Sequence, residues 1–181
     1  MPVKREIIAI DDNYYLSSAP TAEDLGSLVM HLNNREVSDH LLRVPFPYTH
    51  NEAERYIKNA EERTKEFGRC MNWQLRNSSH QLIGSITLHN QYGKGSHRDE
   101  IGYWLAKPYW GKGIMAKALI AFSNHVFEYY GLVRLEATIF HFNTASMKVV
   151  EKCGFNYEGT LKKAYFKDGK YIDGKLYSLV R

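Results

Sequence analysis

A strand, a glycine-containing turn and a helix follow one another within residues 99–119, and this succession constrains the fold more than any other part of the chain. Along residues 100–105, Ile101, Tyr103 and Leu105 alternate with Glu100, Gly102 and Trp104, which is the two-residue period of a strand with two different faces. From Ile114 onward, apolar residues recur at helical spacing. Between the two, Gly111 and Gly113 let the backbone come close to a ligand. The sequence therefore predicts a strand–turn–helix unit with a ligand at its turn.

The turn and the start of the helix have the features of an anion-binding site. The first N–H groups of a helix have no partner within the helix, and the helix dipole places positive charge there. Both favour a phosphate group. A polyanionic ligand also accounts for the lysines at positions 107, 112 and 117. We expect a ligand that carries a pyrophosphate, bound by Gly111, Lys112, Gly113, Ile114, Met115 and Ala116.

Two other interpretations of the turn stay open at this point. Gly111-x-Gly113-x-x-Ala116 matches the dinucleotide-binding fingerprint, with Glu136 on a later strand as a ribose partner. Against this, residues 107–110 are bulky and contain a proline, and a single strand–helix–strand unit is visible where a doubly wound fold needs several. The glycines alternatively serve a loop that binds nothing.

Three motifs together indicate a family. EIGYWL at residues 100–105, WGKGIMAKAL at 110–119 and FNTASMKVVEKCGFNYEG at 142–159 resemble the GNAT superfamily of acyl-CoA-dependent N-acyltransferases, and within it the ribosomal-protein N-terminal acetyltransferases. The resemblance runs from about residue 45 to the end of the chain. It implies an α/β (α+β) fold: a twisted, mostly antiparallel sheet with a central splayed parallel pair and helices on both faces.

The resemblance also implies acetyl-CoA as co-substrate. In the family the turn follows a Gln/Arg-x-x-Gly-x-Gly/Ala pattern and holds the pyrophosphate of coenzyme A. Here Trp110 stands at the Gln/Arg position and Met115 at the last small position. Because backbone amides make the contact, the turn keeps its function. The main chain around Trp104 and Leu105 is implied to hold the pantetheine arm, with an N–H near Leu105 as donor to the thioester oxygen.

Patterns elsewhere predict the remaining elements. Short polar links between consecutive strands indicate an antiparallel meander, whereas the strand after the 114 helix must run parallel to the Glu100 strand, because a helix connects them. The expected elements are short strands within 7–18, helices at 21–32, 35–42 and 53–67, strands at 71–75, 82–89, 98–105 and 133–139, a helix at 144–152, and a terminal hairpin turning at 166–171.

Length and composition set limits on the function. A chain of 181 residues, 44% hydrophobic and 24% charged, is typical of one globular domain, expected here to span residues 1–181. Cys70 and Cys153 are isolated, and the eight histidines show no metal-ligand spacing, so we expect no disulfide framework and no metal. No signal core or membrane-length run is present, and the net charge of +4 is modest. We expect a cytoplasmic protein that binds neither membrane nor nucleic acid.

Glu100 is the catalytic base that the resemblance implies. It precedes Gly102, which is expected to mark a bulge or splay, and burial near Trp104 is expected to raise its pKa. Two alternatives stay open. In the first, Glu100 only forms an ion pair with Arg98 or another cation. In the second, Glu136 is the base.

Asn143 and Ser146 stand at the start of the predicted helix 144–152. Ser146 is the candidate acid, because it and the helix dipole both stabilise a thiolate, and the family branch carries Asn-x-x-Ser here with the Asn contacting the cofactor. The alternative is a pair that only caps the helix. A family carboxylate found past this helix is replaced at Tyr165, and Tyr48 lies either in the acceptor pocket or in the core.

These predictions combine into an N-acetyltransferase that moves an acetyl group from acetyl-CoA to a primary amine by direct attack. The acceptor is a protein N-terminus or a small amine, and the terminal hairpin offers an edge for a homodimer. A non-catalytic acyl-CoA sensor or interaction module is the alternative from another class. A nicotinamide-dependent oxidoreductase comes third.

Overall fold

The computed structural model describes residues 6–181, which form two compact units. The first unit holds the described residues up to Leu88 together with Tyr103–Ile114, and the second holds His89–Gly102 and Met115–Arg181. Strand β5 (Arg98–Leu105) therefore contributes to both units. The expectation of a single domain over residues 1–181 stays a prediction.

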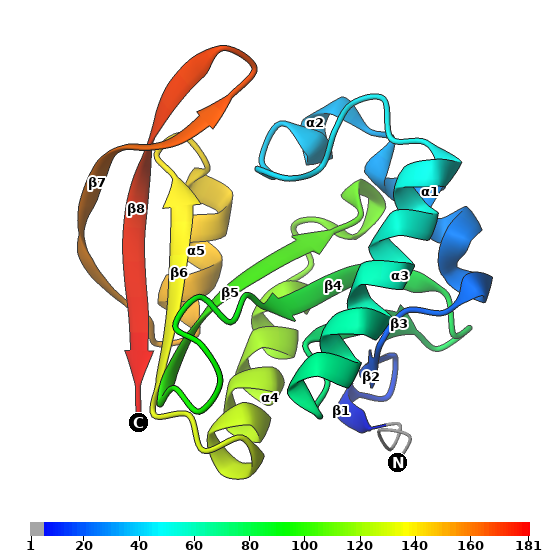
Figure 1. The fold of residues 1–181 in the computed structure, drawn as a ribbon, viewed down its shortest axis with the longest axis horizontal. Helices are drawn as coiled ribbons and strands as arrows, with labels where there is room; N and C mark the ends of the chain where they lie inside the picture. Colours follow the sequence, from blue (N-terminus) through cyan, green and yellow to red (C-terminus); the bar gives the residue numbers. More distant parts are fainter. Residues whose placement is uncertain (1–5) are drawn as a thin grey trace. The chain divides into compact units, whose positions relative to one another are not determined.

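Most of the predicted elements are present (Figure 1). In chain order they are β1 (Ile7–Asp11), β2 (Tyr14–Ser18), η1 (Ala22–Asp24), α1 (Leu25–Leu32), α2 (Arg35–Ser38), α3 (His50–Phe67), β3 (Asn72–Asn77), β4 (Leu82–Leu88), β5, η2 (Lys107–Tyr109), α4 (Ile114–Tyr129), β6 (Arg134–Phe140), α5 (Thr144–Lys152), β7 (Asn156–Lys167) and β8 (Lys170–Val180). The strands follow the order β1-β2-β3-β4-β5-β6-β8-β7.

The direction of the strands confirms the predicted mixed α/β fold. Antiparallel pairs join β1 to β2, β2 to β3 and β3 to β4, as expected for a meander. β5 and β6 run parallel, and α4 connects them. The terminal hairpin adds a feature that the sequence did not indicate: β8, the last strand, pairs with both β6 and β7 and so lies between them.

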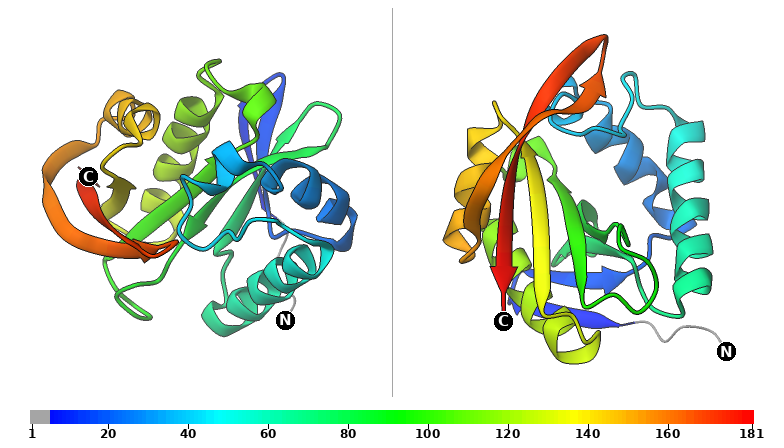
Figure 2. Two further views of the ribbon diagram at one scale, coloured as in Figure 1. Left: turned by 90° about the horizontal axis from the view of Figure 1, so that it is seen from above. Right: turned by 60° about the vertical axis from the view of Figure 1, so that its left-hand side comes forward.

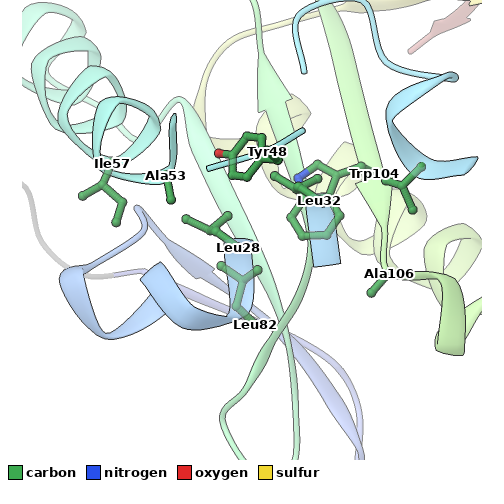
Figure 3. Close-up of a cluster of buried hydrophobic side chains, with 9 residues drawn as sticks. Leu28, Leu32, Tyr48, Ala53, Ile57, Leu82, Trp104 and Ala106 are labelled. Atoms are coloured by element: carbon green, nitrogen blue, oxygen red, sulfur yellow. The ribbon is translucent and has the colours of Figure 1, made fainter. Parts of the chain in front are cut away.

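The core of the first unit gathers side chains from α1, α3, β4 and β5 (Figure 3). Its members are Leu28, Leu32, Val37, Tyr48, Ala53, Ile57, Leu82, Trp104 and Ala106. α3 buries Ala53, Ile57 and Ala60, which recur at helical spacing, and it ends at Gly68 in the left-handed conformation. This cluster fixes the end of β5 from which the glycine turn departs.

Two short helices differ from the prediction. The helix expected from Thr21 begins as the 3₁₀ turn η1, in which the Asp24 carboxylate accepts from the Thr21 N–H and also binds both terminal nitrogens of Arg76 on β3, at 2.7 and 2.8 Å. α2 ends at Ser38 instead of residue 42, because the Ser38 hydroxyl donates to the Val44 carbonyl and turns the chain.

The second unit is built on β6, β8 and β7, with α5 against β6. The predicted hairpin turn is Asp168-Gly169, and both residues have positive φ, at 49° and 77°, as a two-residue turn between twisted strands requires. The hairpin continues beyond the end of β6, as both figures show (Figures 1 and 2).

Two glycines in the first unit allow a stability test. A Cβ added at Gly84 would lie 2.6 Å from the Trp104 carbonyl oxygen, whereas a Cβ at Gly26, within α1, would meet nothing within 4 Å. We expect Gly84→Ala to lower the free energy of unfolding by about 2 kcal/mol through overpacking. Gly26→Ala is expected to raise it by about 0.5 kcal/mol through helix propensity. Urea denaturation of both variants checks this, and equal stabilities would contradict it.

Candidate active site

The parallel ladder between β5 and β6 ends at Glu100. The register pairs Arg98 with Arg134, Asp99 with Leu135, and Glu100 with Glu136. Within the described residues, nothing on β6 pairs with β5 beyond Glu100. Neighbours across a ladder share a face of the sheet, so the two carboxylates that the sequence offered as alternative bases stand side by side.

Glu136 is held by three partners in the second unit. The Tyr92 hydroxyl donates to its Oε2, while Arg98 Nη1 and Arg134 Nε lie 3.1 and 2.6 Å from its Oε1. Burial by itself would raise the pKa of Glu136, but the hydrogen bonds and the two guanidinium charges outweigh it and lower the pKa. Glu136 is therefore a stable carboxylate and a weak base.

Glu100 has the opposite environment. It is 8% exposed, and burial raises its pKa above the ordinary value of a glutamate. Hydrogen bonds with Thr138 offset part of this effect, while the charges of Glu136 and Asp99 add to it. The alternative, an ion pair between Glu100 and Arg98, differs from the structure, in which the Arg98 guanidinium pairs with Glu136. A buried carboxyl with a raised pKa suits a proton acceptor near neutral pH.

Gly102 is required for a reason that the sequence did not reveal. A Cβ at this position would lie 2.6 Å from His89 Nε2, so the glycine lets the imidazole pack against the strand. The His89 N–H also donates to the Glu100 carbonyl at 2.8 Å. His89 thus packs its ring against Gly102 and binds the backbone of Glu100, and no spacing pattern pointed to it.

Trp104 and Leu105 end β5 in the first unit. The Trp104 side chain is buried in the cluster of Figure 3, so the main chain is what this segment offers to a ligand. The Ala106 N–H donates to the Ile83 carbonyl on β4 at 2.8 Å. Because such bonds alternate along a strand, the Leu105 N–H points away from β4. The Leu105 carbonyl accepts from Trp110 Nε1 at 2.7 Å, which gives the unexpected tryptophan a local role.

The glycine turn presents backbone to its surroundings. Gly111 and Gly113 have φ of 73° and 72°, and a Cβ at either would meet nothing within 4 Å, so the turn is open. α4 starts directly afterwards at Ile114. The Ile114, Met115 and Ala116 side chains are buried, at 3%, 4% and 3% exposure. An open turn of left-handed glycines at a helix start fits a phosphate group.

Asn143 is the N-cap of α5. Its Oδ1 accepts from the Ser146 N–H at 3.1 Å, which satisfies one of the helix's free donors. The predicted capping arrangement is therefore present. It also sets Ser146 in the first turn, where the helix dipole favours negative charge.

Two aromatic residues singled out in the sequence have structural roles. Tyr48 is 5% exposed and belongs to the core of the first unit, which favours packing over an acceptor contact. Tyr165 lies on β7, with its ring 5.2 Å from that of Phe140 at the end of β6.

The sequence pattern of the acetyltransferase (GNAT) domain matches residues 16–156. The chain therefore belongs to the GNAT acetyltransferase family. Its relatives include the ribosomal-protein-serine acetyltransferase of Escherichia coli, 35% identical over 100 residues, or 55% of each chain. Another is the uncharacterized N-acetyltransferase YoaA of Bacillus subtilis, 32% identical over 114 residues, or 62% of this chain and 64% of the relative.

The chain spans less than two thirds of the length of three curated relatives that it matches: 64% of YoaA, 57% of the probable N-acetyltransferase YjcK and 54% of the putative ribosomal N-acetyltransferase YdaF, all from Bacillus subtilis. Solved structures match the fold over nearly the whole chain. RimL, a ribosomal L7/L12 alpha-N-protein acetyltransferase in complex with coenzyme A, gives a TM-score of 0.83 at 20% identity, covering 97% of this chain and 98% of its own. The microcin C7 self-immunity acetyltransferase MccE, in complex with acetyl-CoA and AMP, gives 0.85 at 20% identity, covering 100% and 98%.

Residues 6–181 contain neither a metal-binding cluster nor a membrane-spanning helix. The described histidine, cysteine, aspartate and glutamate side chains form no group of three or more that would hold a metal ion. None of the described helices has both the length and the apolar content to cross a membrane.

The predicted site residues lie in both units. Glu100, Met115, Ala116, Asn143 and Ser146 belong to the second, and the other predicted contacts, from Trp104 to Ile114, belong to the first. Sequence reasoning missed His89, Tyr92 and Thr138. The sequence does mark Tyr92 as an aromatic residue in a polar, glycine-rich loop. Its hydrogen-bond partner, Glu136, is known only from the fold.

The contrast between the two glutamates predicts opposite effects on stability. A raised carboxyl pKa gives stability that is present below the unfolded pKa and is lost as pH rises through the folded pKa. Glu100→Gln is therefore expected to leave stability at pH 7 unchanged or higher. A lowered pKa gives stability that is present above the unfolded pKa and is lost as pH falls through the folded pKa. Glu136→Gln should therefore cost about 2 kcal/mol at pH 7. Thermal unfolding between pH 4 and 8 measures both, and a larger loss for Glu100→Gln would overturn the assignment.

Proposed function

We propose that the protein transfers an acetyl group from acetyl-CoA to a primary amine by direct attack of the amine. The observation that carries this proposal is the side-by-side pair of Glu100 and Glu136, whose environments push their pKa values in opposite directions. Carboxyls separated in this way divide the roles of proton acceptor and fixed charge. Membership of the GNAT family supplies the reaction class.

The glycine turn and the start of α4 would hold the pyrophosphate of acetyl-CoA. The contacts would come from backbone N–H groups, because the Ile114, Met115 and Ala116 side chains point into the protein and Gly111 and Gly113 have none. The exposed Lys112 adds a charge near the phosphates. When bound, acetyl-CoA supplies an acetyl group activated as a thioester. Two solved structures of the same fold support this assignment, because RimL is described in complex with coenzyme A and MccE in complex with acetyl-CoA.

Glu100 would act as the base. An acceptor amine is protonated at neutral pH and must lose a proton before it attacks a carbonyl carbon. The Glu100 carboxylate takes that proton, directly or through a water molecule, and its raised pKa brings it nearer to the operating pH than an exposed glutamate. Burial maintains that raised pKa, and the charge fixed on Glu136 adds to it.

The other two roles fall to the main chain and to Ser146. The Leu105 N–H points away from β4 and would donate to the thioester oxygen as negative charge develops there. The Ser146 hydroxyl, in the first turn of α5, would return a proton to the departing sulfur, and the helix dipole stabilises the thiolate until it does. The carbon–nitrogen bond forms after Glu100 has taken the first proton, and the carbon–sulfur bond then breaks. The nitrogen of the tetrahedral intermediate loses a second proton through solvent to the Ser146 oxygen, which has given its own proton to the sulfur, and Glu100 releases the first proton to water.

The acceptor is proposed to be a protein N-terminus or a small amine. The names of relatives support both classes, since one acetylates a serine of a ribosomal protein and another, from Escherichia coli and 26% identical over 139 residues, is an L-amino acid N-acetyltransferase.

Release of free coenzyme A thiol tests this function. Purified protein with acetyl-CoA is expected to release thiol in the presence of one acceptor class from a panel of peptides with varied first residues, free amino acids and polyamines. Acetyl-CoA binding, measured by calorimetry, is the parallel readout. Binding without thiol release for any amine would reject the enzyme and favour the acyl-CoA sensor, whereas tight binding of NAD in place of acetyl-CoA would favour the oxidoreductase.

Glu100→Gln tests the base with the best acceptor of that panel. We expect kcat to fall on the order of 100-fold, the effect of losing one acid–base group, with the Kd for acetyl-CoA unchanged. In the unsubstituted protein, kcat/KM should rise with pH through a pKa above 4.5, because only the ionised carboxylate accepts a proton. Unchanged turnover in Glu100→Gln would exclude this residue as the base.

Two companion variants make that result specific. Glu54→Gln removes an exposed carboxylate from α3, 60% exposed, and should leave turnover unchanged. Ser146→Ala should lower kcat roughly tenfold or more without changing the pH at which activity appears, as expected for an acid rather than the base. If Ser146→Ala changed stability but not kcat, Ser146 would be a structural residue at the start of α5 and not the acid.

A further inference from the structure

The β7–β8 hairpin carries exposed aromatic and basic side chains that the proposed reaction does not use. β7 is the outermost strand in the strand order on this side, so one of its edges faces away from β8. Such an edge presents backbone donors and acceptors to which an extended chain can add. The strand is long, from Asn156 to Lys167, and most of its residues are exposed.

An exposed aromatic pair stands near the tip of this hairpin. Phe166 and Tyr171 face each other across the ladder, with ring centroids 5.1 Å apart, and they are 61% and 67% exposed. Lys163 Nζ lies 5.6 Å from the Tyr171 ring centroid. Large aromatic side chains at this exposure are typical of binding surfaces, because burying them against a partner is favourable.

Lysines surround the aromatic pair. Lys162 is paired with Asp173 at 3.0 Å, and a break in the β7 register next to it places Lys163 in the left-handed conformation, with φ of 49°. Lys167 and Lys170 flank the turn, where Asp168 is the single acidic residue. The tip is therefore basic as well as aromatic, which favours a partner with negative charge.

Next to the aromatic pair, the hairpin contacts the segment that leads into α5. The Tyr165 and Phe140 rings are in contact, and the His141 N–H donates to the Asp173 carbonyl at 3.0 Å. Phe140 and His141 lie within three residues of the Asn143 cap that sets the position of Ser146. A chain lying along the hairpin therefore runs toward residues that the proposed function uses.

We propose that the β7–β8 hairpin binds an acidic, extended segment of a protein acceptor, downstream of the amine that is acetylated. This inference rests on the proposed function and narrows its acceptor class. Carboxylates of the segment pair with Lys163, Lys167 and Lys170, its apolar side chains cover Phe166 and Tyr171, and its backbone adds to the edge of β7.

Two other occupants fit the hairpin less well. A second copy of this chain, meeting hairpin to hairpin about a twofold axis, would bring the same lysines together. A single-stranded nucleic acid suits lysines and aromatic rings, but it offers no aliphatic amine for acetylation. Both are outcomes of the experiment below.

The test is peptide binding measured by fluorescence anisotropy, without any need for turnover. Three peptides share the same first residues and differ in a body rich in Glu and Asp, in Ser and Gln, or in Lys. We expect the acidic peptide to bind best and to weaken as salt rises from about 0.05 to about 0.5 M. Lys163→Gln/Lys170→Gln should weaken it about fivefold, the effect of two exposed ion pairs. Phe166→Ala/Tyr171→Ala should weaken all three peptides.

The matched control is Lys58→Gln/Lys65→Gln, which removes the same charge from the exposed face of α3 and should leave binding unchanged. Equal binding of the three peptides would overturn the proposal. So would tighter binding of a single-stranded RNA of equal charge, or a dimer in analytical ultracentrifugation that Phe166→Ala/Tyr171→Ala abolishes. Because the readout is binding, the two proposals can fail separately. Selective binding of the acidic peptide without thiol release would reject the proposed function but support the hairpin as a binding surface.

Discussion

The cross-strand pair of Glu100 and Glu136 is the interaction on which the candidate chemistry depends. Two carboxylates placed side by side on one face repel each other, and such a pair persists only if their environments differ. Here Tyr92, Arg98 and Arg134 compensate Glu136, whereas the pKa of Glu100 is raised by burial, lowered in part by hydrogen bonds with Thr138, and raised further by the charges of Glu136 and Asp99. The protein thereby turns a repulsive arrangement into one fixed negative charge and one group able to exchange a proton.

The same strand that carries Glu100 also leads to the glycine turn. β5 ends in the first unit, where Trp104 and Ala106 are buried in the hydrophobic cluster. Burying those two side chains contributes a few kcal/mol, which fixes the path of the main chain at Leu105. The turn that follows needs no large side chain. Its proposed function rests on backbone amides, with which Trp110 and Met115 are compatible: Trp110 donates to the Leu105 carbonyl, and Met115 is buried.

Several elements followed directly from sequence pattern. β5 and α5 have the predicted bounds, and the hairpin turn at Asp168-Gly169 is where the dipeptide indicated, because these signals are local: alternation, capping and positive φ. α2 was predicted too long, since a side-chain bond from Ser38 to Val44 ends it. The order of the last two strands was not predictable from hairpin signals, which fix the pairing of β7 with β8 but not which of them meets β6.

The sequence by itself determined the strand–turn–helix unit, the family to which its motifs belong and the set of candidate residues, because each depends on residues close together in the chain. The tertiary structure alone decided which of the two glutamates has its pKa raised by burial and which is neutralised by cations. Tyr92 lies 44 positions from Glu136, and Arg98 lies 38. Those partners meet only when the β5–β6 ladder forms, and the sign of a pKa shift is set by such partners and by burial, which no local pattern encodes.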